Sequence, residues 1–266
     1  MPDHRAACSV SRLMVAAKRA FGICAYAAET RMQAALGIGN DAGNLVVIAP
    51  VLVITAILTL RGSVAARLVW MGTLAYLFYD FLNYALAIHF NSVFLLYCGV
   101  LGLSFYALAA SGLALPIPEA THRYGPRTPV RTTAIVLLLM GMVTAVQWLS
   151  EIIPALLAGR TPQTVHDSGL LTEAVAVLDL AFGVPALVIA GILLLRRKPL
   201  GFVLGPIMLT FLTLSGLMLA PMGIAMARHG FEAGRALCAI GLGIAVVSGV
   251  LPALSMRRRK ATLQPV

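Results

Sequence analysis

Long apolar runs, separated by short polar breaks, cover most of the chain. A helix rises about 1.5 Å per residue, so crossing a hydrocarbon core of about 30 Å takes about 20 residues. Seven runs approach or exceed this length, and they cover residues 45–60, 68–89, 93–115, 133–155, 174–195, 202–226 and 236–254. None alternates apolar and polar residues with a period of two, as a barrel strand would. The pattern therefore predicts an all-α polytopic bundle of seven transmembrane helices.

The composition excludes a soluble protein. Hydrophobic residues make up 60% of the chain of 266 residues and charged residues 11%, against roughly 45–50% and about 25% in soluble domains. Because so few charges cannot cover the surface of a soluble enzyme of this length, we expect an integral membrane protein that contacts the lipid bilayer.

The basic residues predict which end of the bundle faces the cytoplasm. With seven spans, one side holds Arg61, Arg67, Arg123, Arg127, Arg131, Arg196, Arg197, Lys198 and the basic run 257–260. The loops of the other side hold Arg160, Arg228 and Arg235. Cytoplasmic loops carry the excess of Lys and Arg, so we predict a multi-pass protein of the cell membrane with a cytoplasmic C-terminus. The formal net charge of +10 then reflects loops that hold anionic headgroups, and nucleic acid is not an expected partner.

Residues 1–40 form a basic segment whose structure the sequence leaves open. They include Arg5, Arg12, Lys18, Arg19 and Arg31, which seven spans place on the non-cytoplasmic side. The alternatives are a signal peptide ending in the small residues at 25–27, an eighth helix over 13–28, a surface helix and a misplaced start codon. The chain thus divides into this segment, a transmembrane domain over 41–256 and a basic cytoplasmic tail over 257–266.

No motif in the sequence identifies a metal or cofactor site. The four cysteines form no CxxC pair, and the five histidines form no HxxxH pair. The nucleotide-binding patterns GxxxxGK[ST] and GxGxxG are missing as well. We therefore expect no metal and no cofactor.

The second predicted span carries a polar stripe. Its members, at i, i+3, i+4, i+7 and i+8 on one helix face, are Tyr76, Tyr79, Asp80, Asn83 and Tyr84. A carboxylate near the middle of a bilayer costs about 2.5–3.5 kcal/mol on insertion scales, so such a residue faces protein or a water-filled cavity. We therefore expect this face to point into the bundle. No Lys or Arg lies within a predicted span at the depth of Asp80 to pair with it.

Two further spans contribute acids, Glu151 beside Gln147 on the fourth and Asp179 on the fifth. Counting about 1.5 Å per residue from the span ends places these acids and Asp80 in the outer half of the membrane. The hypothesis is a polar pocket that opens to the exterior, lined by Tyr76, Asp80, Asn83, Gln147, Glu151 and Asp179. The alternative is that these groups form interhelical hydrogen bonds that only fix the packing.

The stretch 61–107 resembles a group of bacterial multi-spanning membrane proteins of unknown function. The resemblance rests on Gly62-Ser63 after the first span, on the pattern W-x-G-x-x-x-Y-x-x-Y from Trp70 to Tyr79, and on N-S-x-F-L-x-Y at 91–97. It implies a helical membrane fold and no assigned chemistry. Members of that group open with a clear hydrophobic span, where this chain has the charged segment 12–31, so the total is seven spans or eight.

Three classes of function fit these features. The first is a carrier for a small solute, with Asp80 as a group for proton coupling. No inverted repeat supports it, and spans one to three do not resemble spans five to seven in length or motif. The others are an intramembrane enzyme acting on a lipid or quinone, with Asp80 or Glu151 as base and His89 or His166 as partner, and a non-catalytic sensor or scaffold subunit.

These classes predict different structures. A carrier needs a cavity that reaches past Asp80 and opens alternately to each side. An enzyme needs a histidine and an acid within about 3 Å of a common point. A scaffold would have the stripe at 76–84 packed shut, with every polar group paired internally.

Overall fold

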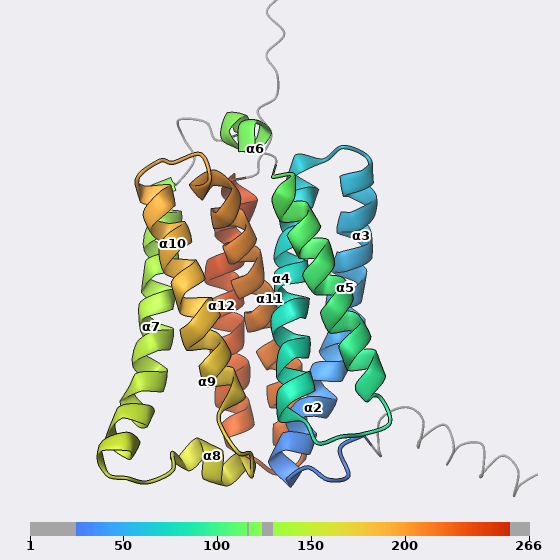
Figure 1. Ribbon diagram of the computed structural model, residues 1–266, viewed down its shortest axis with the longest axis vertical. Helices are drawn as coiled ribbons and strands as arrows, with labels where there is room; N and C mark the ends of the chain where they lie inside the picture. The colour runs from blue at the N-terminus through green and yellow to red at the C-terminus, as the bar shows by residue number, and fades with distance from the viewer. Residues whose placement is uncertain (1–24, 116, 124–129, 256–266) are drawn as a thin grey trace, which may run out of the picture.

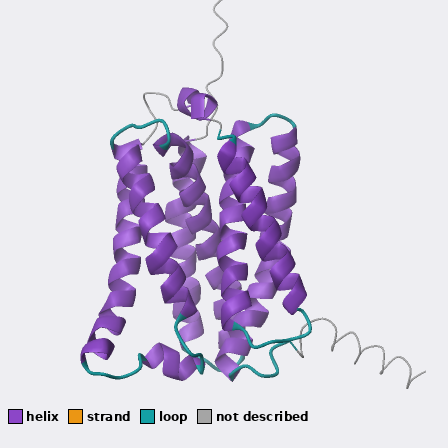
Figure 2. Cartoon of the chain, in the orientation of Figure 1, coloured by secondary structure: helices purple, strands orange, loops and turns teal. Residues whose placement is uncertain are grey.

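The computed structural model describes residues 25–115, 117–123 and 130–255, and the regular structure in these ranges is entirely helical (Figures 1 and 2). Six helical stretches are long and apolar enough to cross a membrane. They are Arg31–Leu60, Phe94–Leu113, Val130–Leu157, Ala174–Leu195, Gly201–Arg228 and Ala233–Val250. Large apolar side chains such as Leu95 and Leu103 are exposed on the outside of the bundle, as lipid-facing surfaces require. The chain is an integral, multi-pass membrane protein.

The first span is longer than the sequence indicated. It consists of α2 (Arg31–Gly43), the π-helical segment η1 (Asn44–Ile48) and α3 (Ala49–Leu60). The Thr30 side chain caps its start by accepting a hydrogen bond from the Gln33 N–H at 3.2 Å. The predicted start at residue 45 was wrong because the polar residues of α2 lower its hydropathy, although one of them, Asn40, is buried in the protein. This span also crosses the boundary predicted between residues 40 and 41.

The predicted second span forms α4 (Val64–Ala87), which has the length of a membrane span but is too polar to count among the six. The Ser63 side chain caps it by accepting a hydrogen bond from the Ala66 N–H at 3.3 Å. In Figure 1 it runs beside α5 (Phe94–Leu113), and it packs against α3, α5 and α11. Its buried residues outnumber those of α5, so α4 is an inner helix of the bundle.

Two short helices mark the ends of the bundle. At one end lies α6 (Ile117–Arg123) and at the opposite end α8 (Gln163–Ser168) (Figure 1); we call these the α6 end and the α8 end. The long helix α7 (Val130–Leu157) connects them. Most of the alternatives for the N-terminal segment fall on residues outside the described part, as does the predicted tail 257–266. The described residues 25–28 form a turn.

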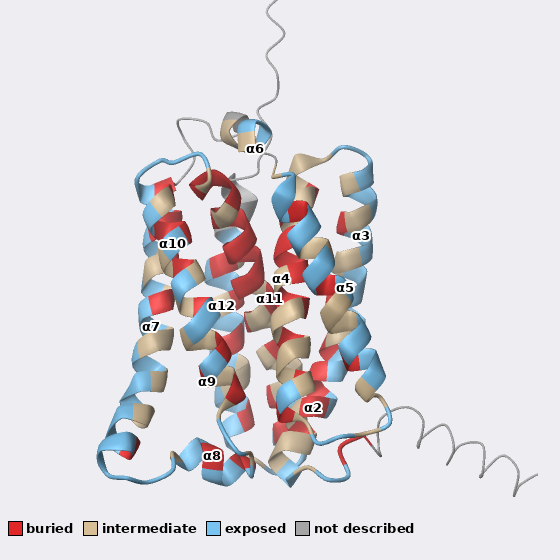
Figure 3. Cartoon of the chain, viewed as in Figure 1, coloured by how far each residue is buried: buried red, intermediate tan, exposed pale blue. Residues whose placement is uncertain are grey.

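The second half of the chain continues with α9 (Ala174–Leu178), the π-helical segment η2 (Asp179–Gly183) and α10 (Val184–Leu195). Two long helices follow, α11 (Gly201–Arg228) and α12 (Ala233–Ser255). Figure 3 shows buried residues along much of α11, which contacts α2, α4, α10 and α12. The core of the bundle therefore forms around α4 and α11.

The two π-helical segments reveal an internal repeat. Residues 44–61 and 179–196 have the same sequence of elements, five π-helical residues followed by twelve α-helical ones and an arginine at the C-cap. Half of the aligned positions hold the same residue. These pairs are Leu45 and Leu180, Pro50 and Pro185, Leu52 and Leu187, Val53 and Val188, Ile54 and Ile189, Ile57 and Ile192, Leu58 and Leu193, Leu60 and Leu195, and Arg61 and Arg196.

The packing around these segments repeats as well. In the first unit (31–113) α3 packs on α4 and α4 on α5, and in the second unit (174–255) α10 packs on α11 and α11 on α12. Both repeated spans run from the α8 end toward the α6 end (Figure 1), so the repeat is parallel and not inverted. The expectation that spans one to three do not resemble spans five to seven was therefore wrong for spans one and five.

The turn after each repeated span contains a left-handed residue, and the two units fill this position differently. The first unit has Gly62 at φ 82°, whereas the second has Arg197 at φ 50°. A side chain with a Cβ in this conformation costs roughly 1–2 kcal/mol, which glycine does not incur.

We predict that Arg197→Gly raises the free energy of unfolding by about 1 kcal/mol and that Gly62→Ala lowers it by about 1–2 kcal/mol. Arg196→Gly is the matched control, because it removes the same charge at a residue with φ −77°. Equilibrium unfolding in detergent measures all three. Equal effects of Arg197→Gly and Arg196→Gly would show that the left-handed conformation contributes nothing.

Candidate functional site

The polar stripe of α4 meets polar residues of the first span inside the bundle. Asn40 and Asp41 come from α2 and Asn44 from the start of η1, while Asp80 and Tyr84 come from α4. The spacing of Asn40 and Asn44 on the first span and of Asp80 and Tyr84 on α4 is one helical turn, so each pair points from one face of its helix. We call these five residues, together with Tyr26 and Tyr76, the α2–α4 network.

Asp80 accepts a hydrogen bond on each carboxylate oxygen. Asn40 Nδ2 donates to Oδ1 and Asn44 Nδ2 to Oδ2, both at 2.7 Å. The side chains of Asn40 and Asp80 are 6% and 7% exposed. Tyr76 completes the arrangement, because its hydroxyl lies 3.5 Å from Asn40 Oδ1 and 3.4 Å from Asn44 Oδ1. Two neutral amides thus hold a buried carboxylate that has no cationic contact among the described residues.

Asp41 forms the outer part of the same network. Its two carboxylate oxygens accept hydrogen bonds from the hydroxyls of Tyr26 and Tyr84, each at 2.8 Å. Asn40 Nδ2 also lies 3.1 Å from the Tyr84 hydroxyl, which joins the two carboxylates into one network. Burial, and then the nearby Asp41, raises the pKa of Tyr26, so the phenol keeps its proton and acts as a donor.

Asp179 lies in a second polar contact on the other side of α4. Tyr79 Oη donates to Asp179 Oδ1 at 2.9 Å and Trp148 Nε1 donates to Oδ2 at 2.8 Å. Asp179 is the first residue of η2, the position that Asn44 occupies in η1. The first residue of each π-helical segment therefore bonds to α4, and the residues that it meets there, Tyr79 and Asp80, are neighbours in the chain.

The remaining candidates on α7 lie apart from these contacts. Glu151 Oε1 accepts hydrogen bonds from the N–H and the hydroxyl of Thr164 at 2.9 and 3.0 Å, which ties α8 to the end of α7. Gln147 is exposed. The six candidates therefore do not form one pocket. Tyr76 and Asp80 belong to the α2–α4 network, Asp179 and Glu151 each form a separate contact, Gln147 is exposed, and Asn83 lines the cavity described next.

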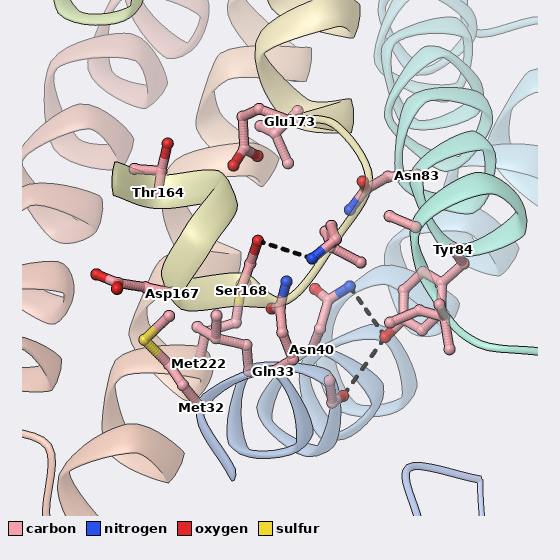
Figure 4. Close-up of a pocket in the computed structure, with 16 residues that line it drawn as sticks. Met32, Gln33, Asn40, Asn83, Tyr84, Thr164, Asp167, Ser168, Glu173 and Met222 are labelled. Carbon is pink, nitrogen blue, oxygen red and sulfur yellow. Dashed lines mark hydrogen bonds between the residues drawn. The ribbon is translucent and has the colours of Figure 1, made fainter. Parts of the chain in front are cut away.

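A cavity of about 270 Å³ opens at the α8 end, between α2, α4, α8, α9 and α11. Its lining includes Asn40 and Tyr84 of the network (Figure 4), and Asn40 also donates to Asp80, which is not part of the lining. Of the six candidates, Asn83 alone lines it. Its oxygen is buried without a hydrogen-bond partner, and Figure 4 shows its amide directed toward the cavity.

Sequence reasoning missed the partners of Asp80 and most of this lining. The sequence could have indicated Asn40 and Asn44, since two amides one helical turn apart beside an acid are unusual within an apolar span. It gave no such indication for lining residues such as Thr164 and Glu173, because they lie in or beside short segments between spans. Only the folded chain brings those segments over the end of α4.

In the described part of the chain, neither His89 nor His166 is hydrogen-bonded to Asp80 or Glu151. The Nδ1 of His89 lies 3.0 Å from Glu29 Oε1, and the Nδ1 of His166 lies 3.4 Å from Asp167 Oδ1. Among the described residues, no group of three His, Cys, Asp or Glu side chains is placed to hold a metal ion. The histidine and acid pairings expected of an enzyme at Asp80 or Glu151 are not formed in the described part of the chain.

We predict that Asn44→Ala lowers the free energy of unfolding by about 1–3 kcal/mol, because a buried oxygen of Asp80 loses its donor. Asn83→Ala is the matched control. It removes an amide whose oxygen has no partner, so its effect should stay within about 0.5 kcal/mol. Unfolding of the purified protein in detergent compares the two variants, and equal losses would contradict the role given to the Asn44–Asp80 contact.

Comparisons with known proteins provide no assignment for this site. No protein-family model matches the chain, no curated protein is similar to it, and no solved structure matches its fold.

Proposed function

We propose that the protein is a membrane carrier for a small solute, which enters through the cavity at the α8 end. In this proposal α4 is a seventh membrane crossing, in addition to the six apolar spans. The α8 end faces the exterior and the α6 end the cytoplasm of a cell. Asp80 is the group that would couple transport to protons.

The distribution of charge supports this orientation. The turns and helix ends at the α6 end include Arg61, Arg67, Arg131, Arg196, Arg197 and Lys198, whereas those at the α8 end include Arg31, Arg160, Arg228 and Arg235. Arg and Lys accumulate in cytoplasmic loops, and with seven crossings α12 ends on the same side as α6. The basic loops would contact anionic headgroups there.

The observation that carries the proposal is that the cavity and the α2–α4 network share residues. Asn40 and Tyr84 line the cavity, and the same side chains bond to Asp80 and Asp41. A solute that bonds to Asn40 or Tyr84 competes with those contacts, so its arrival changes the surroundings of a membrane-embedded acid. This is the kind of connection that a coupled carrier requires.

The parallel repeat and the π-helical segments give further support. Many carriers are built from repeats, some of them parallel and related by an axis along the membrane normal. Single π-helical turns inside α-helices occur frequently at functional sites. Here both of them begin with a residue that bonds to α4.

A rigid scaffold explains less of the structure. It accounts for the network, in which Tyr76, Asp80 and Tyr84 are all paired internally. It gives no reason for a cavity at the end of that network, nor for the unpartnered oxygen of Asn83. In the conformation described, the cavity ends at the network, as expected for a carrier that is closed toward the cytoplasm.

Cysteine accessibility tests the proposal. In a background with Cys8, Cys24, Cys98 and Cys238 replaced by serine, we predict that Asn83→Cys reacts with an impermeant maleimide from the exterior. Thr73, which is fully buried on the Asp80 face of α4, lies beyond the network toward the α6 end. Thr73→Cys should react from the cytoplasmic side, because a carrier also visits a conformation open to that side.

Oriented membrane vesicles labelled from either side provide the measurement. Leu103→Cys on the exposed face of α5 is the control for reagent that enters from the lipid, and it should stay unmodified. If Thr73→Cys reacts from neither side while Asn83→Cys is labelled, the cavity belongs to a static receptor and the carrier proposal is wrong.

A further inference from the structure

The charged side chains that line the cavity are both acidic. They are Asp167 on α8 and Glu173 immediately before α9, and no Lys or Arg of the described residues lines the cavity. The two acids approach from the same side as Thr164, opposite the α4 residues Asn83 and Tyr84 (Figure 4). The cavity thus has one acidic wall and one neutral wall.

Glu173 is the more enclosed of the two acids. Burial raises the pKa of its carboxyl, a hydrogen bond from the Val175 N–H lowers it in part, and the charge of Glu151 raises it again. Burial and the Glu151 charge disfavour the ionised form, and a cation beside Glu173 would oppose both. Asp167 is exposed and bonds to Gln163 Nε2 at 2.7 Å, so it contributes charge but is already paired.

The neutral wall offers a free polar group. The oxygen of Asn83 is buried and unpartnered, and its amide borders the same cavity as Glu173. Because the carboxamide oxygen is held by no other group, a rotation of this amide can present it to a ligand as an acceptor. A carboxylate on one wall and an amide oxygen on the other are both acceptors, which suits a ligand that donates hydrogen bonds.

The lining also contains the neutral polar residues Gln33, Asn40, Tyr84, Thr164 and Ser168, but much of the remainder is apolar and the space is small. The apolar residues are Met32, Leu36, Ala87, Ile88, Leu170, Val175 and Met222. The volume of about 270 Å³ lies just below the range of about 300–1,000 Å³ usual for drug-sized ligands. A ligand that fills it would have a short apolar body as well as a polar head.

We propose that the cavity binds a small organic cation, an ammonium group carried by a short apolar body, between Glu173 and Asn83. This inference rests on the proposed function and names the substrate class of the same site. A small anion would face two carboxylates with no lining cation, and a neutral solute would leave Glu173 uncompensated.

Binding to the protein in nanodiscs at neutral pH tests the class with three ligands of nearly equal shape. These are benzylamine as the cation, benzyl alcohol as the neutral form and benzoate as the anion, with methylammonium and choline as smaller and rounder cations. We expect saturable binding of at least one cation, measured by calorimetry and as a ligand-dependent rise in melting temperature, and none of benzoate.

Substitutions locate the binding. Glu173→Gln should weaken cation binding about tenfold or more, while Asp167→Asn should have a smaller effect because Asp167 is exposed and already paired. Glu232→Gln is the matched control, since Glu232 is an exposed acid at the same end of the bundle and does not line the cavity. Size-exclusion profiles and melting temperatures without ligand check that each variant is folded.

Three results would overturn the inference: failure of all three cations to bind, equal binding of benzyl alcohol or benzoate, or equal loss in Glu173→Gln and Glu232→Gln. The cysteine-labelling experiment needs no ligand, so it can succeed when this one fails. In that case the carrier stands and only its substrate class is wrong. Cation binding without labelling of Thr73→Cys would instead identify a cation receptor.

Discussion

The arrangement of the bundle depends on how one carboxylate is held away from water. Asp80 lies on an inner helix, and a buried carboxylate without partners is among the most costly groups that a membrane protein can contain. Asn40 and Asn44 satisfy one oxygen each, which requires the first span to turn these two amides toward α4 while α2 packs on α11. That requirement explains why the first span begins as early as Arg31, and why Tyr26 and Tyr84 can reach Asp41. The neutral donors also mean that the described residues place no fixed positive charge at Asp80.

The two units of the repeat share one arrangement of helices but carry different polar side chains at the same position. Both units place a π-helical segment before a proline and pack the resulting span beside an inner helix. At the first π-helical position, however, the first unit has the amide Asn44 and the second the acid Asp179. The amide donates to a carboxylate of α4, and the acid accepts from a tyrosine of α4. Because the roles of donor and acceptor are exchanged, α4 presents an acid toward the first unit and a phenol toward the second.

The sequence predicted the all-helical membrane fold and the inward stripe on α4, since both follow from periodicity along a single helix. It could not supply the partners of that stripe, which depend on which helices become neighbours. The beginning of α2 was missed because hydropathy treats Asn40 and Asp41 as exposed, whereas Asn40 is 6% exposed inside the bundle. The spacing of Gln147 and Glu151 predicted that both side chains line one polar face. Instead, Glu151 accepts a hydrogen bond from the Thr164 N–H in α8, and Gln147 is exposed. The repeat was hidden because its identities are confined to one span of each unit and are mostly common apolar residues, with only the Pro50–Pro185 and Arg61–Arg196 pairs being distinctive.

The π-helical segments have a mechanical consequence for the spans that contain them. A π-helical turn accommodates one residue more than an α-helical turn, and one residue corresponds to about 100° of rotation about the helix axis. A return of η1 to α-helical hydrogen bonding would therefore swivel α2 relative to α3, turning Asn40 away from Asp80 while α3 keeps its contacts with α4. The same exchange in η2 would swivel α9 relative to α10. The same residue adds a rise of about 1.5 Å, so the change would combine rotation of one half of the span with a short displacement along its axis. The residues that face the centre of the bundle would then differ while the other half of the span keeps its packing.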